Sequence, residues 1–138
     1  MNGRRIIADS GGIYAFLDRK DQHHREAVTF MKNKLKRGAA FVLADVVFSE
    51  LMTLVKARLG PPVAVRAGRS LRDSAAYLWV ALGEEGERET WGIFEKYDDK
   101  EWSYTDCAIL ALSRRLKVKE VFGFDDHFDQ MPDVVRLP

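Results

Sequence analysis

The segment Arg4-Arg5-Ile6-Ile7-Ala8-Asp9-Ser10-Gly11-Gly12 is a short apolar run that stops on a carboxylate, a hydroxyl and two glycines. An apolar run of this length, bounded by a turn signal, predicts a buried strand. In open α/β sheets, ligands bind in the crevice beyond the carboxyl ends of the strands. We therefore expect Asp9 to stand at such a crevice.

Further apolar segments predict the remaining strands, which are residues 39–44, 76–82, 118–124 and, at a sheet edge, 134–137. Segments with helical periodicity predict helices over residues 13–18, 21–37, 45–59, 63–73 and 103–116, with an acidic helix from residue 84. Strands that alternate with helices predict an α/β fold, in which helices cover both faces of a mostly parallel sheet of four to five strands.

Local signals add detail to three of the helices. Asp45 is expected to cap the helix over 45–59, and Gly60-Pro61-Pro62 is expected to stop it and turn the chain into the next helix. In the acidic helix, Trp91 and Phe94 are expected on the inner face. These assignments place the carboxylates discussed below.

Composition limits the class of protein. The 138 residues, 46% apolar and 31% charged, are typical of one globular domain, residues 1–138, with a real core. The single Cys107 excludes an internal disulfide and a paired-cysteine zinc site, so we expect a reducing, cytoplasmic compartment. The apolar runs are too short for a secretory leader or a membrane span.

Three more carboxylates stand in positions comparable to that of Asp9. Glu50 falls within the apolar stripe of its helix, although it could also lie at the stripe's edge and reach solvent. Asp106 has the spacing of a capping box with Ser103 and also points along an apolar face. Asp125 ends an apolar strand, where aspartates also begin turns. Each has a structural explanation when it is taken alone.

The four acids together indicate a metal site. In a parallel sheet Asp9 and Asp125 emerge at the same edge, and Glu50 and Asp106 lie near the starts of flanking helices. Four carboxylates in one pocket repel each other, and divalent cations relieve that repulsion. Oxygen ligands suit Mg²⁺ or Mn²⁺, and such ions commonly serve phosphodiester hydrolysis by activating water and stabilising the leaving oxygen.

The chain also resembles the PIN-domain nucleases, and among them the VapC-type toxins of toxin-antitoxin modules. The matching segments occur in the family's order and are residues 7–10 (IADS), 48–51 (FSEL), 103–111 (SYTDCAILA) and 122–128 (FGFDDHF). The resemblance implies a three-layer α/β sandwich and Mg²⁺- or Mn²⁺-dependent cleavage of RNA. It implies that Asp9, Glu50, Asp106 and Asp125 hold the metal. It further implies a homodimer and a cognate antitoxin that covers the site.

Some positions depart from the family's pattern or leave alternatives open. The family often has a hydroxyl residue where this chain has Gly123. Asp125 and Asp126 are adjacent, and the flanking phenylalanines favour Asp125 as the fourth ligand. Ser10 matches a hydroxyl position that orients water or phosphate. Ser103 has either that role or the capping role.

The arginines, the histidines and the cysteine each have a structural interpretation. A solvated helix face is one interpretation of Arg66, Arg69 and Arg72. The other is that they bind the phosphates of the RNA backbone, which would make RNA binding depend steeply on salt. The three histidines, including His127, are expected at the surface and not in a metal site. Cys107 is expected to be a small packed side chain.

Two other functions compete with that of a toxin. A catalytically inactive PIN-like module would bind RNA or assemble with partners, but the retention of all four acids argues against it. A housekeeping RNA-processing nuclease of the same fold is the second alternative. A neighbouring small gene for a DNA-binding antitoxin would favour the toxin.

Overall fold

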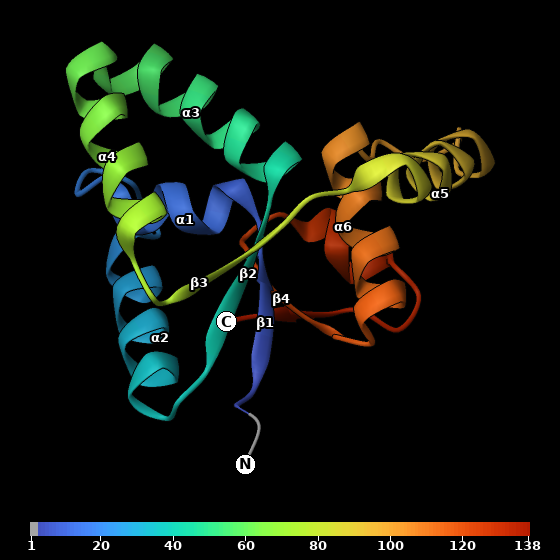
Figure 1. Cartoon of the computed structure of the whole chain (residues 1–138), viewed down its shortest axis with the longest axis horizontal. Helices are drawn as coiled ribbons and strands as arrows, with labels where there is room; N and C mark the ends of the chain where they lie inside the picture. Colours follow the sequence, from blue (N-terminus) through green and yellow to red (C-terminus); the bar gives the residue numbers. More distant parts are fainter. Residues whose placement is uncertain (1–2) are drawn as a thin grey trace.

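The structure, a computed structural model that describes residues 3–138, is built on one parallel sheet with the strand order β3-β2-β1-β4-β5 (Figure 1). In chain order the elements are β1 (Arg5–Ala8), α1 (Ser10–Leu17), α2 (His24–Lys36), β2 (Ala40–Ala44), α3 (Asp45–Leu59), α4 (Pro61–Asp73), β3 (Tyr77–Val80), α5 (Gly83–Lys96), α6 (Tyr104–Leu116), β4 (Glu120–Phe122), the 3-10 helix η1 (Asp126–Gln130) and β5 (Val135–Leu137). The predicted α/β class with a mostly parallel sheet of four to five strands is confirmed, and the sheet has five strands, all parallel.

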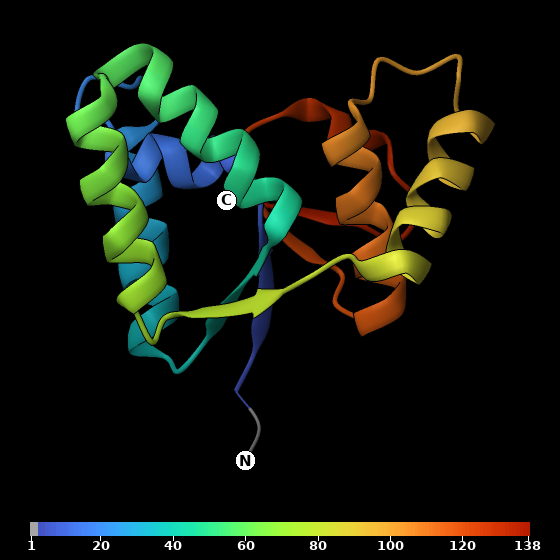
Figure 2. The same ribbon diagram turned by 45° about the horizontal axis from the view of Figure 1, so that its top comes forward.

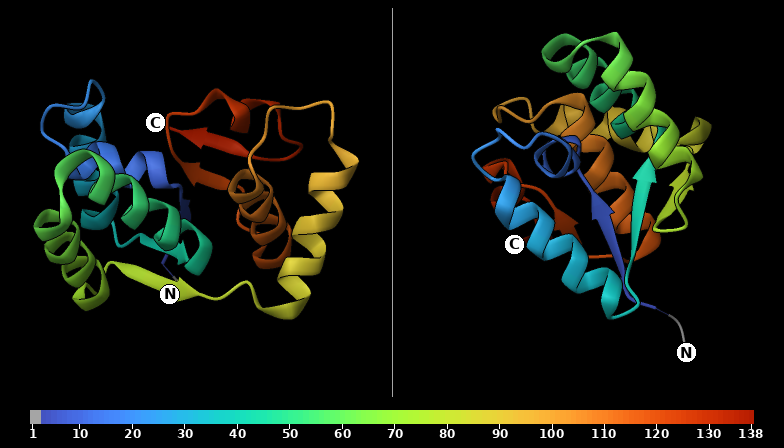
Figure 3. Two further views of the ribbon diagram at one scale, coloured as in Figure 1. Left: turned by 90° about the horizontal axis from the view of Figure 1, so that it is seen from above. Right: turned by 90° about the vertical axis from the view of Figure 1, so that its left-hand side faces the viewer.

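The strand order places the helices on two faces. The chain steps from β1 to β2 to β3 in one direction and then returns across the sheet to β4. Because crossovers between parallel strands are right-handed, the two directions put α1 to α4 on one face and α5 and α6 on the other. Figure 3 shows these two groups on either side of the sheet. The three layers expected for the fold are therefore present.

The core forms where α2 covers the central strands. Phe122 of β4 stacks on Phe30 of α2, with 5.0 Å between the ring centroids, and meets Phe41 of β2 edge-on at 5.6 Å. In β1 the residues Ile6 and Ile7 are fully buried because helices cover both faces of the sheet. This packing fixes β1 and β4 side by side, and their ends position the site.

Helix α1 begins three residues earlier than the sequence indicated. Its first residue is Ser10, so Gly11 and Gly12 lie in the first turn and do not form a separate loop. A Cβ on Gly12 would stand 2.8 Å from the backbone oxygen of Phe122. The missing side chain at Gly12 therefore lets the helix start directly against β4. Close packing, and not a turn, explains why a glycine stands at this position.

The junction of α3 and α4 follows the sequence prediction in part. Gly60 has φ of +93°, and Pro61 and Pro62 occupy the first positions of α4. The expectation that Asp45 caps α3 is wrong, because Ala44 is the N-cap and Asp45 is the first helical residue. The Asp45 carboxylate instead accepts hydrogen bonds from the N–H groups of Val46, at 2.9 Å, and of Leu82. It thereby ties the loop after β3 to the start of α3.

The inner face of α5 differs from the expectation. Trp91 and Phe94 are 54% and 38% exposed, and the buried residues are Gly86, Thr90 and Ile93. Small residues on the inner face allow close packing against α6, and the hydroxyl of Thr90 donates to the backbone oxygen of Gly86 at 2.6 Å. The figures place α5 at the outer edge of the molecule (Figure 2).

Strands β3 and β4 are shorter than the apolar runs that predicted them. β4 ends at Phe122, so Gly123 and Phe124 lie beyond the strand. Asp125 consequently does not end a strand and is instead the N-cap of η1. No helix among residues 3–138 is both long enough and apolar enough to cross a lipid bilayer.

Candidate metal centre

Asp9 follows β1 at the carboxyl edge of the sheet, as expected. Its N–H donates to the backbone oxygen of Phe122 at 2.9 Å, which continues the pairing of β1 with β4. The same residue is the N-cap of α1, and its Oδ2 accepts from the N–H of Gly11 at 3.4 Å. The side chain is buried. A strand and a helix thus fix one carboxylate from both sides.

Burial makes the ionised form of Asp9 unfavourable. Burial first, and the charges of Asp106 and Glu50 next, raise its pKa from 3.8 to about 7, although the backbone N–H groups of Ser10 and Gly11 act in the opposite direction. Two acids from other elements therefore lie near enough to Asp9 to act on its charge. A buried carboxylate with acidic neighbours is the arrangement that a cation would relieve.

Asp106 lies in the first turn of α6 and is also buried. The predicted capping box is confirmed, because the N–H of Asp106 donates to the Ser103 hydroxyl at 3.0 Å and the N–H of Ser103 donates to Asp106 Oδ2 at 2.9 Å. The neighbouring Cys107 is packed in the core, and burial raises its pKa to about 11. The cap holds the Asp106 carboxylate at the helix start, where it meets other polar groups.

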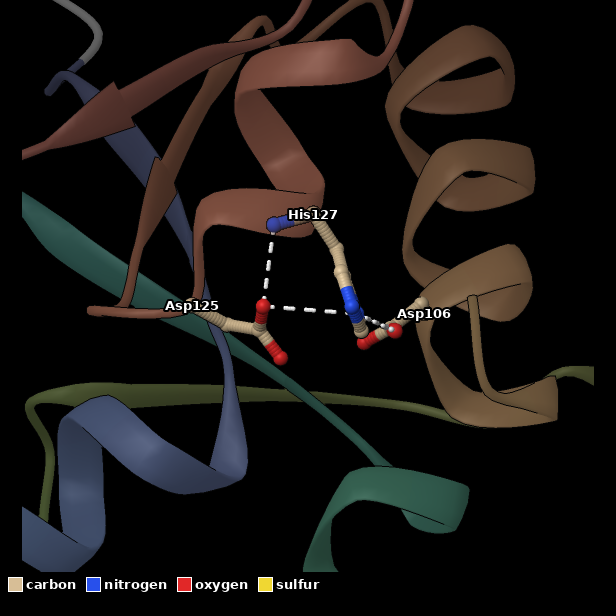
Figure 4. A group of neighbouring side chains, drawn as sticks. All are labelled: Asp106, Asp125 and His127. Carbon is tan, nitrogen blue, oxygen red and sulfur yellow. Dashed lines mark hydrogen bonds and ion pairs between the residues drawn. The ribbon is translucent and has the colours of Figure 1, made fainter. Parts of the chain in front are cut away.

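His127 was missed as a member of this group. It was expected at the surface, but its Nδ1 lies 3.0 Å from Asp106 Oδ2 and 3.3 Å from Asp125 Oδ1 (Figure 4). The hydrogen bond to Asp106 raises its pKa, and the charge of Asp125 acts in the same direction. Asp125 also accepts from the N–H of His127 at 2.9 Å, within one turn of η1. A histidine two residues after an acid at a helix start was the available signal.

Glu50 lies apart from this group. Glu50 is exposed in the second turn of α3. The prediction that it lies within the apolar stripe is therefore wrong, and the alternative prediction, that it lies at the edge of the stripe and reaches solvent, is confirmed. Its charge nevertheless raises the pKa of Asp9. Among residues 3–138, the one group of three or more potential metal ligands whose ligand atoms all lie within 4.8 Å of one another is Asp106, Asp125 and His127.

Ser10 and Gly123, the two positions compared with the family's hydroxyl pattern, both lie next to Asp9. Ser10 is buried beside Asp9 at the start of α1. A Cβ on Gly123 would stand 3.2 Å from the Cβ of Asp9. The absence of a side chain at 123 therefore leaves room for Asp9 at the edge of the sheet.

The arginines of α4 are exposed, as expected for either of their proposed roles. The guanidinium of Arg72 lies over the rings of Phe48 and Trp79, at 5.9 Å and 5.5 Å from their centroids. Arg69 and Arg72 also line an apolar groove of about 340 Å³ between α3 and α4. Arg66 does not line this groove.

The residues present fit a divalent cation. Among the described residues, no lysine or arginine forms an ion pair with Asp9, Asp106 or Asp125, so the buried carboxylates of Asp9 and Asp106 lack a permanently charged cationic partner. Neighbouring corners of an octahedral magnesium site lie about 3 Å apart, since each ligand is about 2.1 Å from the ion. The separations of 3.0 and 3.3 Å around His127 Nδ1 are of this size.

A parallel sheet that brings an acidic cluster to its carboxyl edge, at the starts of α1, α6 and η1, defines an α/β protein with a candidate cation-binding centre. The chain belongs to the PIN domain family, whose sequence profile matches residues 6–134. No curated protein matches the sequence.

Solved structures with this fold come from several bacteria. VapC20 of Mycobacterium tuberculosis, a toxin that cleaves the sarcin-ricin loop, has a TM-score of 0.82 at 22% identity, over 91% of this chain and 93% of its own. VapBC2 of Rickettsia felis, bound to a promoter DNA fragment, has a TM-score of 0.69 at 8% identity, over 96% and 97%. FitAcB of Neisseria gonorrhoeae has a TM-score of 0.66 at 16% identity, over 96% of each chain. These likenesses show the fold.

Proposed function

We propose that this chain is a metal-dependent endoribonuclease that hydrolyses RNA phosphodiester bonds. Asp9, Glu50, Asp106 and Asp125 hold Mg²⁺ or Mn²⁺ in this proposal. The observation that carries it is the burial of Asp9 near Asp106, with no lysine or arginine of residues 3–138 in an ion pair with either carboxylate. Hard divalent ions prefer such oxygen ligands and commonly bridge to phosphates.

The protein's own groups have separate tasks at this centre. The bound ion would supply an activated water and would stabilise the charge that develops on the leaving oxygen. Asp9 and Asp106 are fixed by the starts of α1 and α6, whose N-terminal dipoles partly offset the carboxylate charge. Asp125 is exposed and reaches the centre from the side open to solvent. Ser10 and Ser103 are the hydroxyls proposed to contact a phosphate.

The biological role we infer is that of a toxin in a toxin-antitoxin pair. The similarity to the sarcin-ricin loop toxin and to the VapBC2 complex supports this role. A cognate antitoxin and a homodimer belong to the same proposal, as does a cytoplasmic location. Exposed apolar side chains such as Leu78, Trp79, Trp91 and Phe94 supply surface that protein partners would cover.

Metal-dependent cleavage is the test. The purified protein is incubated with a pool of structured RNAs, including a sarcin-ricin loop oligonucleotide, with Mg²⁺, with Mn²⁺ and with chelator. Cleavage in both metals and none in chelator is the expected result. Asp9→Asn and Asp106→Asn are expected to abolish it, whereas Asp126→Asn, a substitution of the exposed neighbour of Asp125, is expected to leave it largely intact.

Two outcomes would overturn the proposal in different ways. Cleavage that persists in chelator, or in Asp9→Asn, would remove the carboxylate-metal mechanism. RNA binding without cleavage in any metal would favour the inactive binding module. If cleavage occurs but the neighbouring genes encode no antitoxin, the housekeeping nuclease becomes the better assignment.

A further inference from the structure

Building on the proposed nuclease, we propose that His127 Nδ1 is itself a ligand of the metal, which makes the centre a mixed nitrogen and oxygen site. The sequence pattern and the family resemblance supply acidic ligands alone. The structure adds an imidazole whose Nδ1 faces the carboxylates of both Asp106 and Asp125 (Figure 4). An imidazole nitrogen changes which ions the centre prefers.

The geometry distinguishes this nitrogen from a passing surface contact. Nδ1 lies 3.0 Å from Asp106 Oδ2 and 3.3 Å from Asp125 Oδ1. Ligands at adjacent octahedral corners lie about 3 Å apart. All three ligand atoms lie within 4.8 Å of one another, and an ion bound among them would replace the Nδ1 proton that is donated to Asp106 in the metal-free chain.

The position of the ring is fixed by the backbone on both sides. Asp125 caps η1 and accepts from the N–H of His127 at 2.9 Å, which holds the start of the turn. Phe128, the next residue, is fully buried and anchors the turn to the core. With the turn fixed in this way, the hydrogen bond of Nδ1 to Asp106 Oδ2 at 3.0 Å holds the imidazole at the carboxylates without an ion.

The combination of nitrogen and oxygen ligands predicts which metal ion the centre prefers. Carboxylate and water ligands suit Mg²⁺, whereas imidazole favours first-row transition ions, with affinity that rises from Mn²⁺ through Co²⁺ to Ni²⁺. His127 therefore raises the affinity for Mn²⁺ relative to Mg²⁺. An oxygen ligand in its place would lower that ratio without removing the centre.

The test uses Mn²⁺ as its own probe. Electron spin echo spectra of the Mn²⁺-loaded protein are expected to show nitrogen coupling from a bound imidazole. His127→Asn places an amide group near the position of Nδ1 and is expected to lose the coupling, with Mn²⁺ affinity about tenfold lower and Mg²⁺ affinity changed less. His23→Asn is the matched control, because His23 stacks on Phe124 next to Asp125, and it is expected to retain the coupling.

A second variant and a folding measurement keep the test decisive. His127→Ala is expected to lose the coupling as well, and thermal unfolding of both metal-free variants checks that they fold. The absence of nitrogen coupling in the parent would overturn the assignment, because the imidazole would then not be bound to Mn²⁺. Equal or tighter Mn²⁺ binding by His127→Asn would also overturn it, because the ring would then contribute nothing to binding. Metal binding is measured apart from cleavage. Nitrogen coupling without RNA cleavage would refute the nuclease alone, and cleavage without coupling would refute His127 alone.

Discussion

The side chain of Asp9 lies directly against the backbone of Gly123, at the ends of the neighbouring strands β1 and β4. A Cβ at 123 would stand 3.2 Å from Asp9 Cβ and 3.4 Å from its Oδ2. Such contacts are tight, so a larger residue must displace one of the two groups. The lack of a side chain at Gly123 therefore helps to set the position of the Asp9 carboxylate.

Gly123→Ala is expected to weaken metal binding more than folding. The added methyl group pushes the Asp9 carboxylate by a few tenths of an ångström, and Mn²⁺ affinity should fall several-fold while the free energy of unfolding changes by less than about 1 kcal/mol. Calorimetric Mn²⁺ titration and urea unfolding measure the two quantities. Gly92→Ala on α5 is the control, because a Cβ there meets nothing within 4 Å. Unchanged Mn²⁺ affinity in Gly123→Ala would contradict the prediction.

The raised pKa of Asp9 makes the metal-free protein less stable as pH increases. The folded chain binds the proton with a pKa of about 7, against 3.8 for an ordinary aspartate, so the folded state holds more protons between these values. The stability from this group is full below about pH 4 and is lost as pH rises through 7.

Asp9→Asn removes this dependence. In chelator, its free energy of unfolding is expected to exceed that of the parent at pH 8 by on the order of 3 kcal/mol, with a smaller difference at pH 5. Urea unfolding at both pH values checks the prediction. Mg²⁺ should shrink the difference at pH 8 because it stabilises only the parent's carboxylate. A difference that does not vary with pH would refute the pKa assignment.

Replacing Ser103 separates its two proposed roles. Ser103→Ala removes the acceptor for the N–H of Asp106, and it should cost about 1 kcal/mol of folding stability. Ser103→Asn retains a capping oxygen and lacks the hydroxyl. If capping is the only role, Ser103→Asn restores both stability and cleavage rate. Restored stability with slow cleavage would instead show that the hydroxyl contacts substrate.

The arginines of α4 are expected to bind RNA phosphates. Replacing Arg66, Arg69 and Arg72 with glutamine should reduce the slope of log affinity against log salt by about 2 for single-stranded RNA. Filter binding at several salt concentrations measures the slope. The control replaces Lys32, Lys36 and Arg37, which are exposed at the end of α2. Equal slopes in the two triple variants would show that the α4 arginines are only a solvated face.

The sequence predicted those parts of the centre that depend on local patterns. An apolar run that ends on Asp9 was sufficient to place this acid at the sheet edge, and the spacing of Ser103 and Asp106 was sufficient to place a helix start. Asp106 also shows that a capping role and a place at the centre are compatible, because one carboxylate caps α6 and meets His127.

The parts that were missed depend on tertiary packing. The position of His127 two residues after Asp125 was the available local signal, but its contact with Asp106, 21 residues away, depends on tertiary packing. Trp91 and Phe94 have helical spacing, but α5 buries Gly86 and Thr90 because close approach to α6 requires small side chains. For Glu50 the periodicity left two positions open, within the apolar stripe or at its edge, and only the packed structure shows that it is exposed. Periodicity identified the helices and did not identify which faces are buried.

The pairing of β1 with β4 joins two segments that lie at opposite ends of the described chain. Asp9 leaves the ribosome early during synthesis, whereas Asp125 and His127 emerge more than a hundred residues later. The centre therefore has no working partial form on a nascent chain. A ribosome that makes the proposed nuclease is exposed to it only after translation has carried β4 out of the exit tunnel and into register with β1.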